Sequence, residues 1–124
     1  MPVVYTFDAT RNAVFGALTD PVTVEDWESA LTELLGSGVP ADVRTLWDLR
    51  AMDFRNVDRR TLAQINEFRR RSPGRTTARL ALVVADDFAF GMARMFELMS
   101  AESDGRIMVF RDYDEAVAWL LLER

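Results

Sequence analysis

One stretch decides the fold class of this chain of 124 residues: Leu80-Ala81-Leu82-Val83-Val84-Ala85. It is almost continuously apolar, which is typical of a strand that is buried on both faces. Such strands occur in parallel sheets with helices on both sides, so we expect an α/β fold. Asp86 or Asp87 follows the strand directly and is expected to cap a helix that runs to about Met99.

Strands and helices alternate outward from this stretch in both directions. The pattern combines apolar spacing with capping pairs, such as Thr23 with Asp26 and Asp112 with Glu115. The expected elements are, in order, a hairpin of strands 3–7 and 13–18, a helix that Thr23 caps and Gly36 ends, a strand over 43–49, a helix from about 57 to 71, the strand 80–85, a helix to about 99, a strand over 106–110 and a helix that Asp112 caps.

This order, ββαβαβαβα, predicts a single domain over residues 1–124, with a five-stranded mixed sheet and four helices. Right-handed crossovers would make strands 2–5 parallel, with strand 1 antiparallel and the spatial order 1-2-3-4-5. In open α/β sheets, ligands bind beyond the carboxyl ends of the parallel strands. That edge is expected near Asp48-Leu49-Arg50, Asp86-Asp87 and Arg111-Asp112.

The composition excludes several chemistries. The chain has no His and no Cys, and all fifteen of its basic residues are Arg. Nucleophilic triads, thiol redox chemistry, Schiff bases and the phosphate-binding lysine of P-loops are therefore absent. Asp86 and Asp87 could ligate Mg²⁺, but helix capping is the simpler interpretation. We expect a protein that is not an enzyme and has no cofactor or metal.

The net charge of −5 argues against general affinity for nucleic acids. Arginines are nevertheless concentrated between Arg55 and Arg79, either as a solvated helix face or as a grip for an anionic partner. No apolar run is long enough to span a bilayer, and the first residues do not resemble a signal peptide. A cytoplasmic location without integral membrane association is expected.

Three segments together resemble the SpoIIAA-like (STAS/SEC14-type) proteins. They are the strand Val43 to Leu49 with its Trp-Asp-Leu-Arg ending, the strand Leu80 to Ala85 followed by Asp86-Asp87, and the close Val109-Phe110-Arg111-Asp112…Glu115-Ala116…Trp119-Leu120. The resemblance implies a SpoIIAA-like fold. In the anti-sigma factor antagonists of this group, a kinase phosphorylates a serine in the turn that corresponds to residues 54–61. That serine is absent here, and Thr61 is the only hydroxyl nearby.

Two functional hypotheses follow. The first is a regulatory or protein-interaction domain whose partner is another protein or a second copy of the chain. The contact would use the third and last helices, because both carry more apolar residues than one core face needs. Phe88, Met92, Met95, Phe96 and Met99 would form the core face of the third helix, with Phe90 and Leu98 on its flanks. The extra apolar residues indicate either that the third helix forms an interface or that it packs between other helices. The same two alternatives apply to Trp119 and Leu122 in the last helix.

The second hypothesis is a binder of a small anionic or lipid-like ligand at the carboxyl ends of the parallel strands. Its anionic group would contact Arg50, Arg94 or Arg111, and its apolar part Phe88 or Phe90. The residues predicted to bind a ligand or partner are Arg50, Asp86, Asp87, Phe88, Phe90, Arg94 and Arg111.

Overall fold

The chain forms a five-stranded mixed sheet and four α-helices. The computed structural model describes residues 3–19, 23–72, 78–99 and 106–122. The elements are β1 (Val3–Asp8), β2 (Ala13–Thr19), α1 (Val24–Gly36), β3 (Arg44–Ala51), a short 3₁₀ turn η1 (Phe54–Asn56), α2 (Arg59–Arg71), β4 (Leu80–Val83), α3 (Asp87–Met99), β5 (Ile107–Phe110) and α4 (Tyr113–Leu120).

The predicted sheet topology is confirmed. The strands are hydrogen-bonded in the order β1-β2-β3-β4-β5, with β1 antiparallel to β2 and every other pair parallel. The central strand β4 is buried at all four positions, as its apolar run predicts. The carboxyl ends of β2 to β5 therefore meet at one edge of the sheet.

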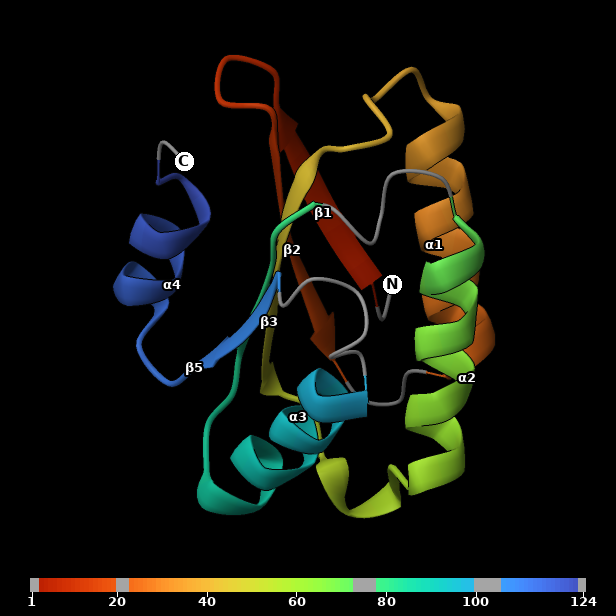
Figure 1. Cartoon of the computed structure of the whole chain (residues 1–124), viewed down its shortest axis with the longest axis vertical. Coiled ribbons are helices and arrows are strands. Elements are labelled where there is room, and N and C mark those ends of the chain that lie inside the picture. Colours follow the sequence, from red (N-terminus) through yellow and green to blue (C-terminus); the bar gives the residue numbers. More distant parts are fainter. Residues whose placement is uncertain (1–2, 20–22, 73–77, 100–105, 123–124) are drawn as a thin grey trace.

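The helices cover the two faces of the sheet unequally. Figure 1 shows α1, α2 and α3 on one face and α4 alone on the other. The larger core cluster, which includes Trp27, Trp47 and Phe96, lies beneath the three helices. The smaller cluster, which includes Leu46 and Leu120, lies beneath α4. In the part of the chain that the structure describes, no helix is long and apolar enough to cross a membrane.

Side-chain caps determine where the helices begin. Thr23 and Asp26 form the predicted reciprocal capping box of α1. Asp86, rather than Asp87, caps α3, because its Oδ1 accepts a hydrogen bond from the Ala89 amide at 2.8 Å. The expected start of the second helix near Val57 was two residues too early: Asp58 accepts from the Thr61 amide and so makes Arg59 the first helical residue.

The predicted core face of α3 was partly wrong. Phe96 is buried, but Phe88 and Met95 are 53% and 36% exposed. Ala89 and Ala93 face the core instead. Small side chains on the inner face let the helix approach the sheet closely, so the larger apolar residues one helical step away are turned outward.

One arginine in the basic segment is not on the solvated face. Arg69 is only 3% exposed, and its Nη2 lies 3.4 Å from the Ala78 carbonyl oxygen. Its neighbours Arg70 and Arg71 are exposed, and both contact Glu67. Arg75 lies outside the described residues. The solvated-face interpretation of this segment therefore does not hold for Arg69, which the end of α2 turns toward the core.

Candidate functional site

The carboxyl edge of β3 carries the first predicted binding residue. Arg50 forms an ion pair with Asp48, with 2.8 Å between Nη2 and Oδ2. Its guanidinium also lies over the ring of Tyr113, 5.4 Å from the centroid. The hydrogen bond from Arg50 lowers the pKa of Asp48, so this carboxyl is ionised at neutral pH.

A second group of predicted residues meets at the start of α3. Arg111, which follows β5, pairs with Asp87 and lies over the ring of Phe90, 5.2 Å from its centroid. Phe88 is beside them in sequence but is 53% exposed. The structure therefore brings Arg111, Asp87 and Phe90 together, while Asp86 is engaged in capping the helix.

Arg94 lies apart from that group, about two turns along α3. It pairs with Glu97, with 2.7 Å between Nη1 and Oε2. All three predicted anion-binding arginines are thus paired with carboxylates of their own chain. Within the described residues, no cluster of three or more acidic side chains is placed to hold a metal ion.

The outer side of α3 presents an apolar stripe. It consists of Phe88, Gly91, Met95 and Leu98, whose spacing of three, four and three residues places them on one side of the helix. Phe88 and Leu98 are 53% and 63% exposed, and a Cβ atom built at Gly91 meets nothing within 4 Å. The inner side of this helix packs on the core, so the stripe is left without a partner within the described chain. This observation favours the interface interpretation of α3.

In the last helix, α4, the large apolar side chain is packed rather than exposed. Trp119 is half-buried and packs on Phe110, with ring centroids 5.8 Å apart. Arg79 lies over the same indole at 5.6 Å and donates to the Leu122 carbonyl oxygen at 2.6 Å. The packing interpretation therefore holds for Trp119, whereas the Leu122 side chain is 55% exposed.

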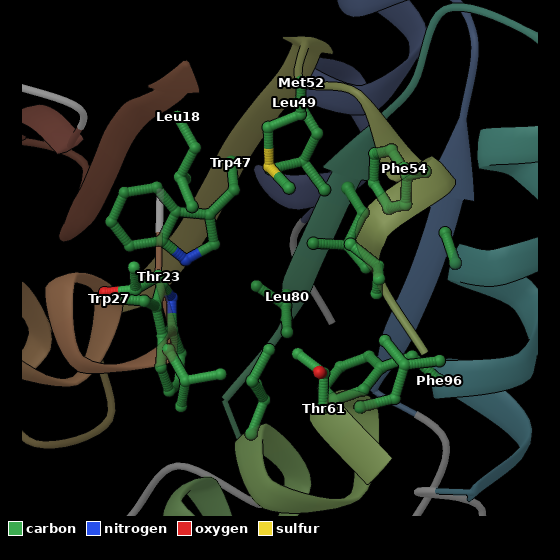
Figure 2. A pocket seen from close by; sticks show the side chains of 16 residues that line it. Leu18, Thr23, Trp27, Trp47, Leu49, Met52, Phe54, Thr61, Leu80 and Phe96 are labelled. Atoms are coloured by element: carbon green, nitrogen blue, oxygen red, sulfur yellow. The ribbon is translucent and has the colours of Figure 1, made fainter. Parts of the chain in front are cut away.

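Sequence reasoning missed an apolar cavity of about 120 Å³ beneath α1, α2 and α3. Figure 2 shows its lining, in which Trp47, Leu49 and Leu80 come from the strands and Trp27 and Phe96 come from helices. The threonines Thr23 and Thr61 stand at the starts of α1 and α2. None of the predicted arginines lines this cavity.

A glycine accounts for the position of Trp47 along the cavity. Gly16 and Trp47 are direct neighbours in the β2–β3 pairing. A Cβ atom at Gly16 would lie 2.2 Å from Cζ3 and 2.6 Å from Cε3 of the indole, closer than atoms can approach. Only glycine allows the ring to lie across β2. A glycine inside an apolar strand was the one sequence signal that could have indicated this close approach.

Thr61, the only hydroxyl near the turn where the anti-sigma factor antagonists carry their serine, lines the same cavity. Its Oγ1 donates a hydrogen bond to Asp58 Oδ1 at 2.8 Å, and the residue is half-buried. The Asp58 carboxylate, whose pKa is lowered by the amide and hydroxyl of Thr61, holds this hydroxyl in place.

The sequence matches no protein-family model and no curated protein. The structure, in contrast, is similar to the crystal structure of an uncharacterized protein of the DUF3478 family from Shewanella loihica, which has a SpoIIAA-like fold. The TM-score is 0.65 at 15% sequence identity, and the match covers 95% of this chain and 93% of the other. The predicted resemblance is therefore confirmed at the level of architecture: this chain has a SpoIIAA-like fold.

Proposed function

We propose that the chain is a non-enzymatic protein-interaction domain that docks through the outer stripe of α3. The observation that supports this function is the exposure of three large apolar side chains, Phe88, Met95 and Leu98, on one side of one helix. Contiguous exposed apolar surface on a small domain commonly marks a contact surface.

The composition and the carboxyl groups support a role without catalysis. The chain has no His, Lys or Cys, so a catalytic acid or base would have to be a carboxyl group. The carboxyl pKa values that are shifted are all lowered; that of Asp53, for example, is lowered to about 2 by Arg55. A general acid at neutral pH needs a raised pKa.

A second copy of the chain is the partner that fits this stripe. Its residues follow heptad spacing, with Phe88 and Met95 at one seam position and Gly91 and Leu98 at the other. When two such helices pair in opposite directions, Met95 of each copy faces Gly91 of the other, and Phe88 faces Leu98. The missing side chain at Gly91 provides a hole for the methionine, and the pair is self-complementary, as a two-fold interface requires.

The charges beside the stripe favour such pairing. Arg94 is paired with Glu97, and Arg111 with Asp87, so each copy brings neutralised charges to the contact. A single helix of 13 residues offers less area than a standard stable interface. We therefore expect a reversible dimer that forms as the concentration rises.

Sedimentation velocity over a range from micromolar to millimolar concentration tests this proposal. We expect a monomer–dimer equilibrium that Met95→Glu weakens by more than about tenfold, because the carboxylate would be buried against the partner helix. Gly91→Leu should weaken it as well, by filling the hole. Leu122→Glu is the matched control: it places the same charge on an exposed apolar residue beyond α4 and should leave the dimer unchanged.

Two outcomes would contradict the proposal. One is a chain that stays monomeric at millimolar concentration. The other is a dimer that Leu122→Glu and Met95→Glu weaken equally. Far-UV circular dichroism of each variant shows whether the fold is retained, which is expected because the substituted side chains are exposed.

A further inference from the structure

We infer that the cavity beneath α1, α2 and α3 is a binding site for a small, uncharged and mainly apolar molecule about the size of one substituted aromatic ring. Such a molecule would carry one hydrogen-bond acceptor. This inference is independent of the proposed self-association, because the cavity touches the inner side of α3 and the stripe lies on its outer side.

The size of the cavity limits the ligand. Its volume is about 120 Å³. For comparison, an engineered cavity of roughly 150 Å³ in another protein, lined by aliphatic and aromatic side chains, binds benzene. The present cavity therefore suits a molecule of about six to eight non-hydrogen atoms. A fatty acyl chain, a nucleotide or a sugar is too large.

The lining determines the charge of the ligand. All of the described lining residues are uncharged, and apart from two threonines they are apolar or aromatic. A carboxylate or an ammonium group would lose its hydration there without meeting an opposite charge. A neutral apolar molecule gains from the apolar surface that it buries against this lining.

The two indole groups supply the polar contact. Trp27 and Trp47 are only 8% and 4% exposed, and both line the cavity. Within the described residues, no hydrogen bond from either indole N–H to a protein acceptor is found. Neither indole nitrogen is among the fully enclosed polar atoms of the described residues that lack a partner, so each N–H is open to solvent or to a molecule in the cavity. A ligand oxygen or nitrogen in the cavity would provide an acceptor, and Figure 2 shows both rings along one side of the site.

The two hydroxyls at the rim differ in how they are engaged. Thr61 donates to Asp58, and Thr23 accepts from the Asp26 amide at 3.0 Å. Because Thr61 has used its proton, it does not serve as a donor to the ligand. The indole N–H groups and the Thr23 hydroxyl are therefore the donors that select an acceptor-bearing molecule.

Three indole N–H signals allow a direct test by ¹H–¹⁵N NMR on the dilute, monomeric protein. Trp27 and Trp47 line the cavity, whereas Trp119 packs against Phe110 on the opposite face of the sheet and serves as an internal control. The probes are anisole and ethylbenzene, which match in size and differ in the acceptor oxygen, and benzoate, which is charged.

We expect anisole and ethylbenzene to shift the Trp27 and Trp47 signals in a saturable manner and to leave Trp119 unchanged. Anisole should bind about 2- to 10-fold more tightly than ethylbenzene, as one neutral hydrogen bond implies. Benzoate should produce no saturable shift. Ala93→Leu should abolish binding, because Ala93 lines the cavity from α3 and a leucine there fills it. Ala63→Leu, on the exposed side of α2, is the matched control and should bind normally.

The wild-type titration decides the question even if Ala93→Leu does not fold. Equal shifts of all three indole signals, or no saturable shift with anisole up to its solubility, would overturn the binding site. Equal affinities for anisole and ethylbenzene would overturn the role of the indole donors. None of these outcomes bears on the dimer, which is measured separately at high concentration.

Discussion

Replacing Gly16 by alanine should destabilise the protein, although alanine normally stabilises a strand relative to glycine. The added Cβ would lie 2.2 Å from Cζ3 of Trp47 and 3.0 Å from the Val4 carbonyl oxygen. Overpacking of this kind costs about 1–3 kcal/mol. The gain from removing the flexibility of glycine is about 0.5–1 kcal/mol. The expected net loss in the free energy of unfolding is therefore about 0.5–2 kcal/mol.

Urea denaturation followed by circular dichroism measures this loss. With a typical slope of about 2 kcal/mol per molar urea, the midpoint should fall by roughly 0.3–1 M. Gly91→Ala is the control, because a Cβ atom there meets nothing within 4 Å and alanine favours helix. It should raise the free energy of unfolding by about 0.8 kcal/mol.

A double-mutant cycle locates the cause of the loss. Trp47→Leu removes the ring that the new Cβ would strike, so Gly16→Ala introduced into that background should become neutral or stabilising. The coupling energy is then expected to be about 1–3 kcal/mol. The reasoning is refuted if Gly16→Ala is as stable as Gly91→Ala, or if its cost is the same with and without Trp47.

Two further predictions concern buried and titrating groups. Arg69→Ala should lower the free energy of unfolding by about 2–4 kcal/mol, because it removes a buried side chain that contacts the Ala78 carbonyl. Arg70→Ala is the control on the exposed face and should change the free energy of unfolding by less than about 0.5 kcal/mol. Thermal or urea melts of both variants measure the difference. The pKa of Tyr5 is raised because its hydroxyl donates a hydrogen bond to Glu33 at 2.8 Å. The stability that this contact contributes is therefore complete below the ordinary tyrosine pKa of about 10, and it is lost as pH rises through the higher pKa of the folded state. Absorbance near 295 nm during alkaline titration should show one tyrosine ionising later in the native chain than in Glu33→Ala, and identical curves would contradict the assignment.

The caps and the periodic apolar runs were read correctly because they are local. Thr23 and Asp26 form both hydrogen bonds of a capping box, and Asp112 accepts from the Glu115 amide, each within one turn of its helix. Every residue from Leu80 to Val84 is buried, so the apolar pattern of this strand is the same whichever helices cover its two faces. Together with the right-handed crossover of parallel strands, these signals predicted the strand order, and the family resemblance of three segments predicted the SpoIIAA-like fold.

The rotation of α3 could not be read in the same way. The helix has apolar residues on most of its circumference, so its periodicity allows several core faces. Which face turns inward depends on the space above the sheet. Ala89 and Ala93 permit a close approach that Phe88 and Met95 would prevent. The choice is therefore made by packing between segments that are distant in sequence.

The candidate functional residues show the same difference between what local sequence determines and what tertiary packing determines. The sequence by itself determined the absence of His, Lys and Cys, the helix caps and the succession of strands and helices along the chain, because these depend on residue identity and on neighbours a few positions away. Tertiary structure alone decided that Arg111 is paired with Asp87, that Phe88, Met95 and Leu98 are exposed, and that the indole rings of Trp27 and Trp47 border one cavity. Arg50 and Arg94, in contrast, pair with carboxylates only two and three residues away in sequence. Exposure, cavities and ion pairs between distant residues arise only when distant segments meet, so no local pattern specifies them.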